Sequence, residues 1–107
     1  MVEKDEFRNL LLKARDKLAK VKHIVFQIHE IIEEPWELQP EVIRYRVYYS
    51  AMDRPKILTQ VFNSRNIDRE VMLGVDKEAS VPAGLTREER TVMRIAYWLW
   101  LAYKENK

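Results

Sequence analysis

Cysteine is absent from the 107 residues, which excludes disulfide bonds, thiolate metal sites and a thiol nucleophile. Only two glycines occur, and neither belongs to a glycine-rich phosphate loop. No apolar run approaches the ~20 residues of a membrane span, and the N-terminal MVEKDEFRN lacks the apolar core of a signal peptide. The expectation is therefore a cytoplasmic protein that does not engage a membrane.

The sequence also has no large excess of positive or of negative charge. The formal net charge is only +2, with 19 Lys and Arg against 17 Asp and Glu, so a nucleic-acid function has to rest on local charge. A content of 47% hydrophobic and 34% charged residues predicts a globular chain, and its length favours a single domain over residues 1–107. Abundant Lys, Arg and Glu with few glycines are typical of thermophilic proteins.

The residues of an enzyme active site are poorly represented. There is no G-x-S-x-G elbow and no Cys/His spacing for zinc, and His23 and His29 are the only histidines. The nearest approach to a metal cluster is His29 with Glu30, Glu33 and Glu34, a combination that is routine on a solvated helix end. The sequence therefore predicts a protein that is not an enzyme, with no catalytic residue, metal or cofactor.

A long helix is predicted from Glu3 to Glu34. Apolar residues recur there at steps of four and three, as in a helix that packs along another helix; they are Phe7, Leu11, Ala14, Leu18, Val21, Val25, Ile28 and Ile32. The stripe favours burial in a globular domain, with a homodimeric coiled coil as the alternative. Pro35 cannot continue a helix, so residues 35–41 are expected to form a connector, in which Trp36 either packs or lies at the rim of a binding surface.

The first strand is predicted from Val42 to Met52. Alternation places Ile43, Tyr45, Val47, Tyr49 and Ala51 on a core face. The other face carries Arg44, Arg46, Tyr48 and Ser50, two guanidiniums and a ring that suit a polyanion with stackable bases.

A second strand is predicted from Lys56 to Ser64, after the turn residues 53–55. A three-residue loop pairs Tyr48 with Gln60 and Arg46 with Phe62, which places both of these partners on the open side with the arginines. A loop longer or shorter by one residue sends Phe62 to the core instead.

A third strand is expected over Glu70 to Val75, followed by a loop. The last helix begins with a capping box, Thr86 with Glu89 three positions later, and runs to about Lys104. Its segment AYWLWLAY is apolar nearly all round, so it is expected either to lie in the core or to form an oligomer interface. The fold class expected is α+β, with an antiparallel sheet of about three strands packed on a long N-terminal helix and a C-terminal helix.

These residues predict a non-catalytic protein that binds single-stranded DNA or RNA with little sequence preference, and that assembles as a homo-oligomer. Arginine and lysine would neutralise phosphates, the two rings would stack on bases and the glutamine would contact a base edge. The predicted nucleic-acid-binding residues are Arg44, Arg46, Tyr48, Lys56, Gln60 and Phe62.

Two alternatives stay open at the level of sequence. The Arg and Tyr side chains are common on the wet face of a sheet and would then only solvate it, or the last helix covers this face and makes the rings core. The alternative function is a protein-interaction or assembly module that oligomerises or docks a partner through its helices.

The element order and the character of Tyr45 to Tyr49 (YRVYY) and Val61 to Phe62 resemble the small archaeal single-stranded DNA-binding proteins known as ThermoDBP and their relatives. The resemblance covers most of the chain and rests on no diagnostic motif. It implies an exposed aromatic surface, flanked by basic residues, that holds single-stranded DNA or RNA in an oligomer. No residue role is carried over from that family.

Overall fold

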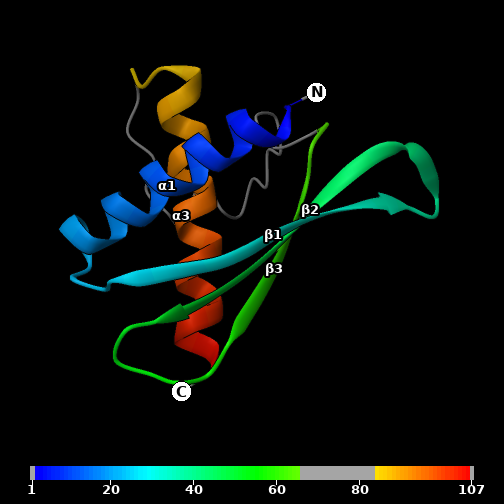
Figure 1. Ribbon diagram of the computed structural model, residues 1–107. Coiled ribbons are helices and arrows are strands. Elements are labelled where there is room, and N and C mark those ends of the chain that lie inside the picture. Colours follow the sequence, from blue (N-terminus) through cyan, green and yellow to red (C-terminus); the bar gives the residue numbers. More distant parts are fainter. Residues whose placement is uncertain (1, 66–83, 107) are drawn as a thin grey trace.

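The computed structural model describes residues 2–65 and 84–106, and the statements below concern these residues. In chain order the elements are α1 (Lys4–Val21), β1 (Phe26–Trp36), β2 (Gln39–Ala51), β3 (Leu58–Asn63) and α3 (Arg87–Glu105) (Figure 1). The three strands form one antiparallel sheet in the order β1-β2-β3. The expected α+β class, with an antiparallel sheet and a helix at each end of the chain, is confirmed. The expected third strand at Glu70 to Val75 lies outside the described residues.

The N-terminal helix α1 is shorter than the sequence predicted, because it ends at Val21 and not at Glu34. Its first half is as expected, with Phe7, Leu11 and Leu18 in the core. His23 then adopts a left-handed backbone with φ of 58°, a conformation that stops a helix and that non-glycine residues adopt only locally. The prediction of one helix through residue 34 was therefore wrong.

Residues 26–36 form the edge strand β1 in place of the second half of that helix. The segment contains three Ile residues, Phe26 and Trp36, and β-branched and aromatic side chains suit a pleated, half-buried surface better than a helix. The expected connector is likewise wrong, since Pro35 and Trp36 belong to the end of β1. Proline is tolerated there because an edge strand pairs on one side only.

Strand β2 lies in the middle of the sheet and contains most of the strand predicted at residues 42–52. Its register with β3 differs from the predicted one by one residue: Tyr49 pairs with Leu58, Val47 with Gln60 and Tyr45 with Phe62. Because side chains alternate along a strand, this shift moves every β3 side chain to the other face. The predicted pairing was wrong, and the alternative register left open by the sequence is the one that forms.

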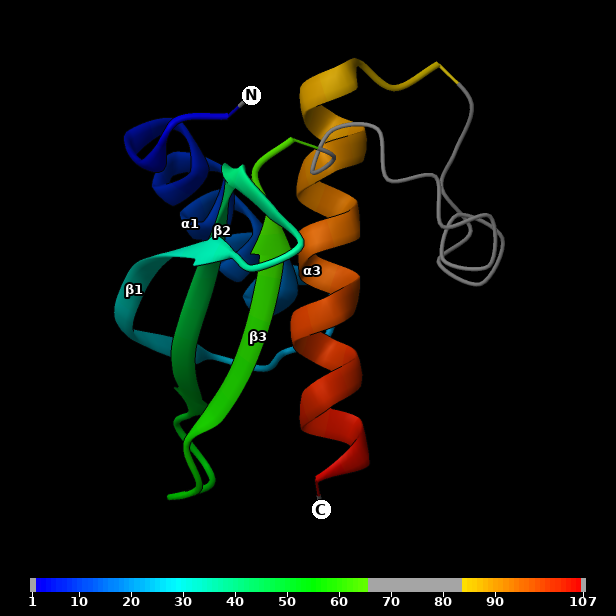
Figure 2. The same cartoon turned by 90° about the vertical axis from the view of Figure 1, so that its right-hand side faces the viewer.

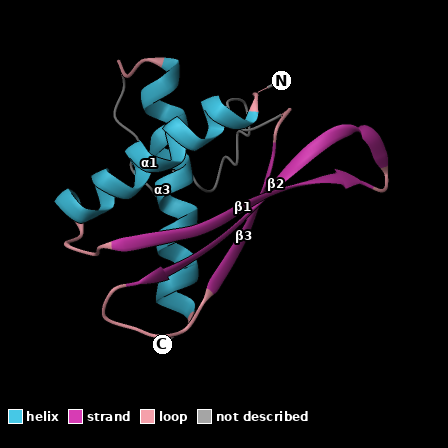
Figure 3. Cartoon of the chain, viewed as in Figure 1, coloured by secondary structure: helices cyan, strands magenta, loops and turns pink. Residues whose placement is uncertain are grey.

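Helix α3 begins as the sequence predicted. The Thr86 hydroxyl accepts a hydrogen bond from the Glu89 amide at 3.1 Å, and the Glu89 carboxylate accepts one from the Thr86 amide at 3.0 Å. Val92, Ile95 and Leu99 are buried along its inner stripe. The two helices contact each other and cross, as Figures 2 and 3 show from two directions.

Both helices pack on the same face of the sheet, which is the face of the odd-numbered β2 residues. From α1, the ring of Phe7 stacks on Tyr45 with centroids 4.7 Å apart. From α3, the Leu99 carbonyl accepts a hydrogen bond from the Tyr49 hydroxyl at 3.1 Å. Burial raises the pKa of both tyrosines above the ordinary value of 10, so both remain neutral. Arg44, Arg46 and Tyr48 therefore lie on the opposite face, here called the open face, which is bordered by the buried even-numbered residues Val42 and Ser50.

Candidate nucleic-acid interface

The open face carries the two arginines and the tyrosine that the sequence selected on β2. Arg44, Arg46 and Tyr48 are each partly exposed, and alternation along the strand places them in one row. Neighbours from both edge strands complete the row, since Ile32 and Val61 are the Cα partners of Arg46. The structure thus confirms that these three side chains share one face and that α1 and α3 contact the other.

Both arginines are held by one carboxylate from β1. Glu34 is the Cα partner of Arg44 and accepts two hydrogen bonds from Arg46, at 2.9 Å from Nη2 and 3.2 Å from Nε. Arg44 Nη2 lies 3.6 Å from the same carboxylate. The three side chains are 27–32% exposed, although Arg44 Nε is buried and has no hydrogen-bond partner among the described residues. We call Glu34, Arg44 and Arg46 the Arg–Glu cluster.

Electrostatics of this cluster favour its charged state. The hydrogen bonds from Arg46 hold the pKa of the Glu34 carboxyl below its usual value, with added attraction from Arg44. Two cations share one anion, so the cluster keeps a charge of +1 at neutral pH. The arrangement shows where an oxyanion sits between two guanidiniums, a geometry that also suits a phosphate.

Trp36 stands at one end of the Arg–Glu cluster. The guanidinium carbon of Arg44 lies over its ring at 6.0 Å from the centroid, a cation–π geometry. The indole is partly exposed at the end of β1, where the hairpin extends beyond the two helices (Figure 1). The sequence left two roles open for Trp36, packing or a place at the rim of a binding surface. Its position is at the rim of the open face.

Two predicted site residues, Phe62 and Gln60, are not on the open face. The one-residue register shift turns both toward the helices. Phe62 is only 5% exposed and packs on Phe7 with ring centroids 5.4 Å apart. Gln60 donates from Nε2 to the Trp98 carbonyl of α3 at 3.2 Å. The proposed stacking role of Phe62 and base contact of Gln60 are therefore wrong for this fold.

Lys56 is remote from the arginine row as well. It lies in the turn between β2 and β3, and its Nζ donates to Asn106 Oδ1 at 2.9 Å. In the same turn, Arg54 Nη1 donates to the Tyr103 carbonyl at 2.9 Å, and its guanidinium lies 3.7 Å from the centroid of the Tyr103 ring. These bases of the hairpin fasten the turn to the end of α3, so local basicity in the sequence overstated the charge of the open face.

The histidine and glutamates that resembled a metal cluster sit on a strand. His29 lies at a register shift in β1, and its Nε2 is 2.7 Å from Ser50 Oγ. The i, i+4 geometry that would pair His29 with Glu33 on a helix therefore does not occur. Within residues 2–65 and 84–106, no three His, Asp or Glu side chains form a group that could hold a metal ion.

Glu34 is the residue of this site that the sequence did not predict. It was assigned to a helix end, so it could not be paired with the arginines. A usable signal was present: the run from Phe26 to Ile32 is rich in β-branched and aromatic residues, and a strand there forms a hairpin that brings position 34 opposite position 44.

The aromatic segment of α3 is divided between core and surface. Leu99 and Ala96 are buried, whereas Tyr97, Trp98 and Trp100 are partly exposed. Tyr97 contacts both tryptophans, with ring centroids 5.9 and 6.0 Å away. The expected homo-oligomer stays a prediction that sedimentation equilibrium can test.

Comparisons of the chain with protein-family models, with curated protein sequences and with solved structures found no match. Neither α1 nor α3 is both long enough and apolar enough to cross a lipid bilayer.

Proposed function

We propose that this protein binds single-stranded DNA or RNA on the open face of its sheet, with little preference for sequence. The observation that carries the proposal is the Arg–Glu cluster, in which two guanidiniums converge on one oxyanion beside partly exposed rings. Cations for phosphates together with rings for unpaired bases are the combination that single strands require.

In this proposal a backbone phosphate displaces the Glu34 carboxylate from between Arg44 and Arg46. The exchange replaces the Glu34 carboxylate with the singly charged phosphodiester of the backbone. It also releases the counterions of the nucleic acid, which makes binding salt-dependent. Tyr48 and Trp36, at the two ends of the arginine row, stack on bases, each contributing ~1–3 kcal/mol. Because no side chain needs to read a base edge, binding is general with respect to sequence.

Fluorescence anisotropy of labelled oligo-dT, oligo-U and a duplex control, at low and moderate salt, tests the proposal. We expect salt-sensitive binding of both single strands in preference to the duplex. Arg46→Ala should weaken binding and flatten the salt dependence by ~0.7 in slope, whereas Tyr48→Ala should weaken binding with the slope nearly unchanged.

Arg8 is an exposed arginine on α1, so Arg8→Ala serves as the matched control for Arg46→Ala. If Arg46→Ala and Tyr48→Ala bound the oligonucleotides with unchanged affinity, the open face would not be the nucleic-acid-binding surface. Absence of binding to every oligonucleotide at low salt would refute nucleic-acid binding altogether.

A further inference from the structure

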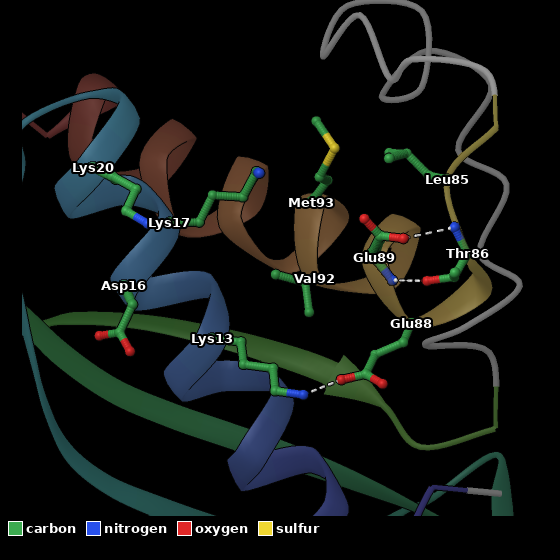
Figure 4. A pocket seen from close by; sticks show the side chains of 10 residues that line it. All are labelled: Lys13, Asp16, Lys17, Lys20, Leu85, Thr86, Glu88, Glu89, Val92 and Met93. Atoms are coloured by element: carbon green, nitrogen blue, oxygen red, sulfur yellow. Dashed lines mark hydrogen bonds and ion pairs between the residues drawn. The ribbon is translucent and has the colours of Figure 1, made fainter.

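A groove of about 490 Å³ separates α1 from the first turns of α3, on a different part of the molecule from the open face (Figure 4). One wall is a lysine ridge on α1, formed by Lys13, Lys17 and Lys20. Steps of four and three residues place these lysines on one helix face, about one turn or ~5.4 Å apart along the axis. The ridge therefore offers cations in a row to whatever lies in the groove.

Two of these lysines are available to a partner. Lys13 is bound to Glu88 of α3 and closes one end of the groove. Lys17 and Lys20 are exposed and make no hydrogen bond or ion pair with any other residue that the structure describes. The nearby Glu89 carboxylate accepts the helix-cap bond from the Thr86 amide, and the charge of Lys17 adds to the lowering of its pKa. Lys17 and Lys20 nevertheless keep ammonium hydrogens that can be donated to the carboxylates of a partner.

The floor of the groove is aliphatic. Leu85, Val92 and Met93 line it between the charged walls, and none of the ten residues that line the groove is aromatic. Methionine adapts its shape to differing apolar side chains, which suits a binding surface. A floor of this kind accepts an aliphatic side chain and offers no ring to a nucleobase.

The apolar surface continues along α3 beyond the groove. Met93, Tyr97 and Trp100 follow at steps of four and three, so they share one helix face. Two ammonium groups cover the Trp100 ring, Lys22 at 4.7 Å and Lys104 at 5.0 Å from its centroid. From Met93 to Lys104 this strip is ~17 Å long, and lysines border it at both ends.

We propose that this groove and strip dock an acidic, amphipathic helix of a partner protein. Its aliphatic side chains pack on Val92 and Met93, and its carboxylates pair with Lys17 and Lys20 and, farther along, with Lys22 and Lys104. A single nucleic-acid strand fits less well, because none of the residues that line the groove is aromatic and none can stack on a base.

The test uses a fluorescein-labelled peptide of about twelve residues, with Leu and Glu spaced to form an amphipathic helix, and a counterpart in which every Glu is Lys. Anisotropy titrations compare the full-length protein with the double variant Lys17→Glu/Lys20→Glu. The double variant Lys4→Glu/Arg8→Glu is the control, because it changes net charge equally at the other end of α1. Thermal melting verifies that each variant is folded.

We expect the acidic peptide to bind and the basic one not to bind. The groove variant should lose about ten-fold in affinity or more, the control variant little, and Met93→Ala a smaller amount. Equal binding of both peptides, or equal loss in the two double variants, would overturn the proposal. If the groove variant lost as much affinity for oligo-dT as for the acidic peptide, the groove would be assigned to nucleic acid instead.

The nucleic-acid proposal and the docking proposal can fail separately. Arg46→Ala should leave peptide binding unchanged, because Arg46 lies on the open face and contacts neither helix. Loss of oligonucleotide binding with peptide binding intact would refute only the nucleic-acid proposal, and the reverse result would refute only the docking proposal.

Discussion

Replacing Glu34 with a neutral residue tests whether Arg44 and Arg46 bind an anion or only solvate the open face. Its carboxylate accepts hydrogen bonds from Arg46 at 2.9 and 3.2 Å and lies 3.6 Å from Arg44 Nη2. In Glu34→Gln both guanidiniums lose this internal anion, while the amide keeps the size of the side chain. We expect Glu34→Gln to bind oligo-dT more tightly than the unchanged protein does, and with a steeper salt dependence.

Salt dependence gives the magnitude. Each phosphate neutralised on a single strand contributes ~0.7 to the slope of log affinity against log salt concentration. Glu34 cancels one of the two arginine charges, so neutralising it frees one cation and steepens the slope by ~0.7. Dilution of salt from about 200 to about 50 mM should then raise the affinity of Glu34→Gln by about 2.6-fold more than that of the unchanged protein.

Anisotropy titrations of labelled oligo-dT over this salt range measure the slope. Glu33→Gln is the matched control, because Glu33 is exposed, carries the same charge and pairs with Tyr45, on the opposite face from Glu34. Identical slopes for Glu34→Gln and Glu33→Gln would refute the reasoning, since the effect would then arise from net charge alone. A slope unchanged from that of the original protein in both variants would show that the arginine pair does not contact phosphate.

Three further predictions concern stability. Phe62→Ala should cost ~3–5 kcal/mol in urea unfolding, because Phe62 is buried against Phe7, whereas Val61→Ala on the open face should cost far less; a small effect of Phe62→Ala would contradict the observed register. Thr86→Ala should cost ~1 kcal/mol through loss of the helix cap, measured in the same way. Hydrogen bonding to Thr86 lowers the pKa of Glu89, so Glu89 contributes stability above its ordinary pKa that is lost as pH falls through the lowered pKa. Glu89→Gln should therefore be less stable than the unchanged protein at neutral pH, and a difference that persisted in acid would exclude the carboxylate as its source.

The C-terminal helix was predictable because its signal is local. Thr86 and Glu89 satisfy each other's backbone amides without help from the rest of the fold. The alternation along residues 42–52 was equally informative, since a central strand with one buried face has to place Tyr45 and Val47 inside.

The boundary between α1 and β1 was not predictable from periodicity. Val25, Ile28 and Ile32 continue the steps of a helix, yet Val25 is 54% exposed and Ile28 is part of a strand. No glycine, asparagine or proline marks the end of α1, because His23 supplies the left-handed residue. Residue type was the better guide in this segment, since Ile and Phe favour a strand.

Two of the six predicted site residues depended on a register that the sequence could not determine. Residues within β2 keep their relative faces whatever the loop length, so Arg44, Arg46 and Tyr48 are correctly placed together. The β3 residues Gln60 and Phe62 depend on the geometry of the turn, and a shift of one residue reversed them. Positions assigned within one strand are thus more reliable than positions assigned across a hairpin.

The fastening of the β2–β3 turn to the end of α3 bears on how the molecule opens. The last turn of a helix ordinarily frays and exchanges its amide hydrogens early. Here Arg54 Nη1 donates to the carbonyls of Tyr103 and Asn106, which are 49 and 52 residues away in sequence. The final turn of α3 can therefore open only when the hydrogen bonds from Arg54 in the β2–β3 turn break. We expect these two distant segments to exchange hydrogen for deuterium as one cooperative unit, and Arg54→Ala to uncouple them.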